Sequence, residues 1–175
     1  SSAKSIANAL VAKSSAEAVL LAAGGVSGPM GVIDHKRGMQ SLFANPQARA
    51  AMAQPIKQPS YIMSARIKPF PCVGTAQCAV AAAIQLNHEL GGDLSGVRKL
   101  RLEMGDHPTV IRHLADAERA NPTSREAADH SIPFLVAVAA LDGELGMKQF
   151  ANARWNDPRV RSFMAKIETH TDDVL

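Results

Sequence analysis

A long apolar segment between residues 124 and 142 constrains the fold of this chain more than any other feature. It begins at a capping box, in which the Thr123 hydroxyl can accept from the backbone N–H of Glu126 while the Glu126 carboxylate reaches back. Gly143 ends it, as glycine does at many helix C-termini. Pro133 fits such a helix only as a kink or near a helix start. The pattern predicts one long apolar helix whose surface must be covered.

The other elements follow from hydrophobic period and from Gly and Pro breakers. Ile6, Leu10, Val19 and Leu20 form the stripe of a helix over 5–23, and Leu100, Leu102 and Met104 alternate with charges in a strand over 97–104. The remaining predictions are short helices within 30–53, a strand over 60–68, helices over 75–90 and 158–165, and a strand over 166–171. Strand 60–68, helix 75–90 and strand 97–104 suggest a βαβ unit. The predicted class is α+β, with helices dominant.

Composition narrows the functional classes. Hydrophobic residues make up 46% of the 175 residues and charged residues 20%, so the chain can bury a core. The net charge of +3 comes from interspersed basic and acidic residues without a basic stripe, which argues against nucleic-acid binding. We read no run of about 18 apolar residues and no signal peptide, and therefore expect neither a membrane span nor secretion. Cys72 and Cys78, six residues apart without a His-rich partner, favour neither a disulfide framework nor a zinc site and suit a cytoplasmic protein.

Three segments carry a resemblance to a known family. They are residues 3–18, which begin Ala-Lys-Ser-Ile; residues 67–72, Ile-Lys-Pro-Phe-Pro-Cys; and residues 125–143, which begin Arg-Glu-Ala-Ala-Asp-His-Ser. In order and spacing they are similar to the MmgE/PrpD family, whose members include 2-methylcitrate dehydratase, cis-aconitate decarboxylase and iminodisuccinate epimerase.

The resemblance implies an architecture of a large all-helical domain followed by a small α+β domain, with the active-site cleft between them. Residues 1–25 would link to the missing helical domain, 26–122 would form the small domain, 123–150 would return to the large domain, and 151–175 would be an incomplete end of the small domain. A homodimer is implied, with no metal or organic cofactor. We therefore expect an incomplete site, and that this chain alone turns over neither 2-methylcitrate nor cis-aconitate.

Reactions of this family move a proton at a carbon beside a carboxylate, so cationic or proton-transferring side chains are needed. Lys4 and Lys68 match motif lysines and are predicted to contact substrate carboxylates and to converge on one cleft. His107, just after the 97–104 strand, is a candidate catalytic group, and His130 a candidate substrate contact with a helix-packing alternative. The other histidines, His35, His88, His113 and His170, are predicted at the surface or in local hydrogen bonds, and Cys72 as a buried small side chain.

The chain departs from the family pattern just after Lys68. Val73 and Gln77 stand where some members carry histidines; valine cannot hydrogen-bond through its side chain, and glutamine does not titrate near neutrality. Two functions stay open. One is a segment of a lyase or isomerase acting on a small di- or tricarboxylic acid, and the other is a non-catalytic split or truncated family member that serves as a binding or assembly subunit.

Overall fold

The computed structural model describes residues 3–33, 35–39, 41 and 62–172, and the chain divides into two compact units, Ser1–Arg66 and Ile67–Leu175. The first unit contains α1 (Ala3–Ala23), as the sequence predicts, ended by Gly24 and by Gly25 at φ +91°. The described part also holds a 3-10 turn, η1 (Ile62–Ser64). The short helices predicted within 30–53 lie largely outside the described residues.

Helix α1 corrects one exclusion made from the sequence. Its segment Ile6–Ala23 is long and apolar enough to cross a membrane by length and composition. The mostly buried core helix of a soluble protein and a signal sequence near the N-terminus pass the same test, and this segment is near the N-terminus with none of it buried. Near its middle, Lys13 and Glu17 form an ion pair at 3.6 Å, and each charge at a bilayer centre would cost about 3 kcal/mol on insertion scales.

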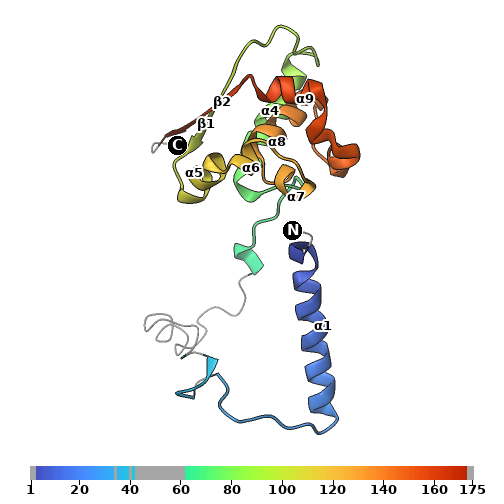
Figure 1. The fold of residues 1–175 in the computed structure, drawn as a ribbon, viewed down its shortest axis with the longest axis vertical. Coiled ribbons are helices and arrows are strands. Elements are labelled where there is room, and N and C mark those ends of the chain that lie inside the picture. The colour runs from blue at the N-terminus through green and yellow to red at the C-terminus, as the bar shows by residue number, and fades with distance from the viewer. Residues whose placement is uncertain (1–2, 34, 40, 42–61, 173–175) are drawn as a thin grey trace. The chain divides into compact units, whose positions relative to one another are not determined.

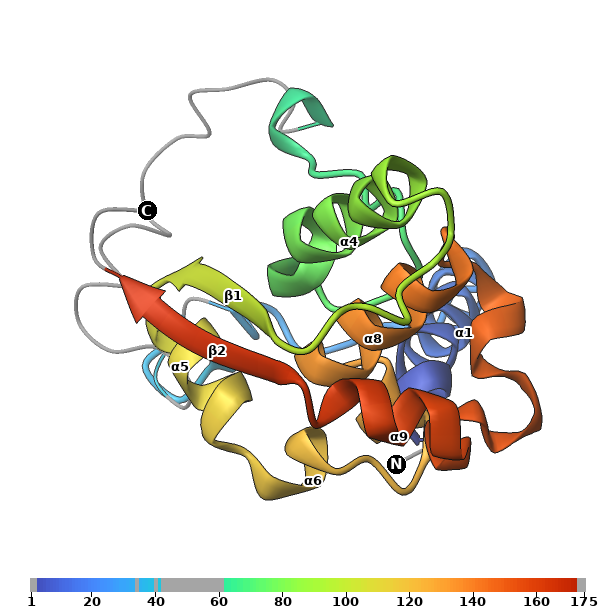
Figure 2. The same ribbon diagram turned by 90° about the horizontal axis from the view of Figure 1, so that it is seen from above.

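The second unit holds the remaining elements (Figures 1 and 2). In chain order these are η2 (Gly74–Ala76), α4 (Gln77–Glu89), β1 (Leu100–Gly105), α5 (Pro108–Ala115), α6 (Ala117–Ala120), α7 (Arg125–Ala128), α8 (Ile132–Asp142), η3 (Met147–Asn156), α9 (Pro158–Met164) and β2 (Ile167–Asp172). Strands β1 and β2 form a two-stranded parallel sheet, with Leu100 opposite Ile167. The mixed content agrees with the predicted α+β class.

The predicted βαβ unit is wrong. Residues 62–64 of the expected strand form the turn η1, residues 65–68 have no regular structure, and residues 60 and 61 lie outside the described part. Met63 and Ile67 are each 92% exposed, so the alternating apolar face has nothing to pack against. A strand is stabilised by its paired neighbour, and alternation alone does not provide one. The parallel partner of β1 is instead β2, reached through α5 to α9.

Helix α8 is the centre of the second unit. Its residues from Phe134 to Ala140 are at most 1% exposed, and its main neighbours are α4 and α9. Figure 2 shows these two helices on different sides of α8. The apolar surface of this segment is thus covered within the second unit itself, while the return of residues 123–150 to a large domain stays a prediction. A helix that is apolar all round belongs in a core.

The predicted helix over 124–142 is two helices, and its capping box is wrong by one residue. Ser124 caps α7 by accepting from the Ala127 N–H at 3.1 Å. The helix ends after Ala128, and the next one, α8, begins at its cap, the buried Ser131, which accepts from the Phe134 N–H at 3.2 Å. Pro133 lies in the first turn of α8, where its lack of an N–H costs nothing, in agreement with a position near a helix start. Gly143 ends α8 in the left-handed conformation, as predicted.

Candidate functional site

Gln77 holds the loop that carries the Lys68 motif. Its Oε1 accepts from the Phe70 N–H at 3.1 Å, and its Nε2 donates to the carbonyls of Phe70 at 3.1 Å and Cys72 at 3.3 Å. These bonds satisfy backbone groups that Pro69 and Pro71 leave without regular partners. Gln77 therefore fixes the loop conformation, and its side chain is engaged in that structural role.

The same loop is joined to the break between α7 and α8. The Val73 N–H donates to the Asp129 carbonyl at 2.9 Å. Cys72, next to Val73 in the chain, is buried as predicted. Burial raises the pKa of its thiol to about 11, while the Lys68 charge lowers this pKa and the Asp129 charge raises it. Lys68 and Asp129 thus both lie within electrostatic reach of one thiol. The fold brings two of the three family-like segments together.

Two histidines meet beside this junction. His113 of α5 is 8% exposed, and its Nδ1 lies 3.1 Å from the Thr75 hydroxyl oxygen. Its ring approaches the His130 ring edge-on, with centroids 6.3 Å apart. His130 Nδ1 lies 3.0 Å from the Glu126 carbonyl and also contacts the Asp129 carboxylate. We refer to Lys68, Cys72, His113, Asp129 and His130 as the loop–helix site.

Burial sets the protonation of His113. Desolvation lowers the pKa of its imidazole, and the charges of Arg119, His130 and Arg112 lower it further, against a small rise from Asp116. His113 is therefore biased toward the neutral form, which can both donate and accept a hydrogen bond. The prediction of a surface or local role is wrong for this residue. The signal was its spacing: Val110, His113 and Leu114 share one face of α5, and that face is packed into the unit.

The four predicted site residues differ in their exposure and location. Lys68 is exposed and His130 half-buried, and both belong to the loop–helix site. His107 is exposed and caps α5, with its Nδ1 accepting from the Thr109 N–H at 3.2 Å. Lys4 lies in the first turn of α1, in the other unit, and its side chain is outside the described part. That Lys4 and Lys68 converge on one cleft stays a prediction.

The loop–helix site offers side chains that can bind anions and transfer protons. An exposed ammonium at Lys68 can bind a carboxylate, and a histidine contacted by a carboxylate, as His130 is by Asp129, is held in one orientation for proton transfer. Across residues 3–33, 35–39, 41 and 62–172, no group of three or more His, Cys, Asp or Glu side chains could hold a metal ion.

Comparison with known proteins gives one family match. A family model described as the MmgE/PrpD C-terminal domain matches residues 70–175, which span every element from η2 to β2. The match includes Cys72, His113, Asp129 and His130 and begins two residues after Lys68. No curated protein sequence matches the chain.

Proposed function

The chain belongs to the MmgE/PrpD family, and from this premise we propose that it is a segment of a cofactor-free lyase or isomerase acting on a small di- or tricarboxylic acid. One observation carries the proposal: the loop after Lys68 hydrogen-bonds to the Asp129 carbonyl, and the Asp129 carboxylate contacts His130, so an exposed cation and a histidine belong to one region of the second unit. The proposal extends to a homodimer and a cytoplasmic location, both implied by the family resemblance.

In this proposal the residues divide the work as follows. Lys68 binds a substrate carboxylate and stabilises the negative charge that develops when a proton leaves the neighbouring carbon. His130, oriented by Asp129, exchanges that proton or contacts a second carboxylate. For Lys4, the other motif lysine, a further carboxylate contact is proposed on the family resemblance alone. His107 is the weakest member of the set, because one of its ring nitrogens already caps α5.

A second candidate function is a non-catalytic binding or assembly subunit. Gln77 favours it, because the residue that stands where some family members carry a histidine is fully engaged in holding the loop. Val73, the other such position, contributes its backbone N–H to Asp129 and has no polar side chain. Reactions that depend on histidines at these two positions are not expected of this protein.

The test is turnover of 2-methylcitrate and of cis-aconitate by the protein translated from its complete reading frame. Lys68→Met should lower kcat/KM roughly 10- to 100-fold, because a hydrogen bond to a charged group contributes about 1.5–3 kcal/mol. Lys148→Met is the matched control, since Lys148 is exposed and its ion-pair partner in the described part of the chain is Glu144, outside the loop–helix site. Equal effects of the two substitutions would remove Lys68 from the site. Absence of any turnover by the unsubstituted protein would favour the assembly subunit.

A further inference from the structure

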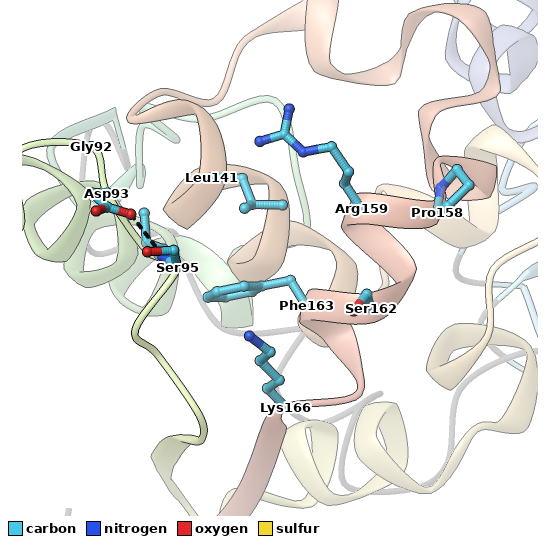
Figure 3. A pocket seen from close by; sticks show the side chains of 10 residues that line it. Gly92, Asp93, Ser95, Leu141, Pro158, Arg159, Ser162, Phe163 and Lys166 are labelled. Atoms are coloured by element: carbon cyan, nitrogen blue, oxygen red, sulfur yellow. Dashed lines mark hydrogen bonds between the residues drawn. The ribbon is translucent and has the colours of Figure 1, made fainter.

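A pocket of about 460 Å³ lies in the second unit, apart from the loop–helix site, with which it shares no residue (Figure 3). One wall is the loop that follows α4, and the other is α9 with the residue that precedes β2. Its lining residues are Gly92, Asp93, Leu94, Ser95, Leu141, Pro158, Arg159, Ser162, Phe163 and Lys166. A volume of this size is in the range of small-molecule sites, which run from about 300 to 1,000 Å³.

The α9 wall is cationic, and its side chains have hydrogen-bond donors without a partner in the described part of the chain. Within the described part of the chain, the Arg159 guanidinium has no hydrogen bond and no ion pair, whereas neighbouring Arg161 donates to the Pro122 carbonyl at 2.7 Å. Lys166 Nζ donates to the Val97 carbonyl at 2.7 Å and lies 5.7 Å from the centroid of the Phe163 ring. An ammonium has three donors, so Lys166 keeps donors for a ligand. This wall suits a carboxylate, which a guanidinium can bind through two parallel bonds.

The opposite wall carries a single acid. The Asp93 carboxylate accepts from the Ser95 N–H at 2.9 Å, and hydrogen bonds from the backbone and side chain of Ser95 hold its pKa below the usual range. Asp93 is therefore ionised at neutral pH. Figure 3 shows Asp93 and Ser95 on one side, with Arg159 and Lys166 across the pocket and Leu141 and Phe163 between them.

We propose that this pocket binds a small apolar α-amino acid. The carboxylate would pair with Arg159, assisted by Lys166; the ammonium would pair with Asp93; and the apolar side chain would pack on Leu141 and Phe163. A dicarboxylate fits less well, because its second carboxylate would face the Asp93 charge. The proposal rests on this pocket alone and does not depend on the family activity.

Three probes of similar size separate the recognised groups: L-norvaline, pentanoate, which lacks the ammonium, and L-norvalinamide, which lacks the carboxylate. Each is titrated into the ¹⁵N-labelled chain while backbone amide shifts are followed. L-Norvaline should give saturable shifts at Gly92, Ser95, Arg159 and Ser162, with a Kd at least tenfold below that of either analogue, as expected from one lost charged hydrogen bond. No saturable shift at these residues, or equal affinity for all three probes, overturns the proposal.

Substitution of Arg159 tests whether this residue binds the carboxylate of the amino acid. Arg159→Gln should raise the Kd for L-norvaline roughly tenfold or more, while the affinity for L-norvalinamide stays unchanged. Arg112→Gln is the matched control, because Arg112 is exposed on α5 and lines no part of the pocket. Both arginines are exposed, and far-ultraviolet circular dichroism confirms that each variant is folded. Unchanged L-norvaline affinity in Arg159→Gln overturns the proposal.

Discussion

At the residue scale, His113 shows how packing alone can change the chemistry of a side chain. Its only hydrogen-bond partner in the described part is the Thr75 hydroxyl, which is 38 residues away in sequence. The groups that act on its charge come from α5, from α6 and its N-cap, and from the break between α7 and α8: Arg112, Arg119, Asp116 and His130. Burial and three of these four groups oppose protonation, so the folded protein binds a proton at His113 less readily than the unfolded chain does.

The sign of the resulting pH dependence is fixed. Because the folded pKa of His113 lies below its unfolded value of about 6.5, the unfolded state takes up protons first as the pH falls. His113 therefore leaves stability intact above about pH 6.5 and lowers it as the pH drops below that value. Urea unfolding between pH 7.5 and 5 should show a fall in the free energy of unfolding that is smaller in His113→Asn. The other five histidines are present in both proteins and cancel in the difference. Parallel pH profiles would contradict this account.

At the element scale, the end of α8 depends on one glycine. Gly143 has φ +68°, and a Cβ placed there would lie 2.6 Å from Asn87 Oδ1 and 3.2 Å from Asn87 Cγ. Asn87 is buried and donates through Nδ2 to the Ala140 carbonyl at 2.6 Å, which joins α4 to the last turn of α8. The glycine thus serves two needs, a left-handed residue and space for the amide of Asn87.

Gly143→Ala should therefore be more destabilising than a left-handed glycine usually is. The left-handed conformation alone costs an alanine about 1–2 kcal/mol. Displacing Asn87 from a buried hydrogen bond adds roughly 1–3 kcal/mol. Gly91→Ala is the control, since Gly91 has φ +63° and a Cβ added there would meet no other group within 4 Å. Urea unfolding should give a larger loss for Gly143→Ala by about 2 kcal/mol, and equal losses would show that Asn87 can move at no cost.

The elements that can be predicted from sequence are those fixed by local signals. Helices α1, α4 and α9 and strands β1 and β2 agree with the sequence predictions within a few residues. All but β2 have a Gly or Pro breaker beside a hydrophobic period, and β2 follows from its alternation alone. The break before α8 does not follow from the sequence, since Thr123, Ser124 and Ser131 are all plausible caps and only the backbone selects among them. The prediction of a strand at 60–68 is wrong because pairing is non-local.

The residues of the candidate site likewise fall into those that the sequence predicts and those that it does not. Lys68 and His130 were found through motifs that are contiguous in sequence. The spacing of His113 indicates the packed face of α5, but its partners Thr75 and His130 are distant in sequence, and no local pattern states which residues meet there. Gln77 was noted only as a departure from the family pattern, because its hydrogen-bond partners belong to a loop whose path the sequence does not specify.

At the scale of the whole molecule, the two predicted apolar helices have opposite surroundings. Helix α8 is covered inside the second unit by α4 and α9. Helix α1 is not: Ile6, Leu10, Val19 and Leu20 are 55–71% exposed, and Val11 and Leu21 are also exposed. Its apolar residues occur around the whole helix, so the predicted single apolar stripe is wrong and the helix presents no distinct polar face to water. Contiguous exposed apolar surface of this kind marks an interaction site or a tendency to aggregate.

The chain alone should therefore self-associate through α1. Burying one leucine side chain contributes about 1.5–3 kcal/mol, so several per helix favour dimers or larger assemblies at micromolar concentration. Multi-angle light scattering should report a mass above that of the 18.5 kDa monomer, and the double variant Leu10→Gln with Leu20→Gln should lower it. Met63→Gln with Ile67→Gln is the control, because these residues are even more exposed but belong to no α-helix. A clean monomer for the unsubstituted chain, or an equal response of the two double variants, would show that α1 does not drive association and that its apolar surface is tolerated in water.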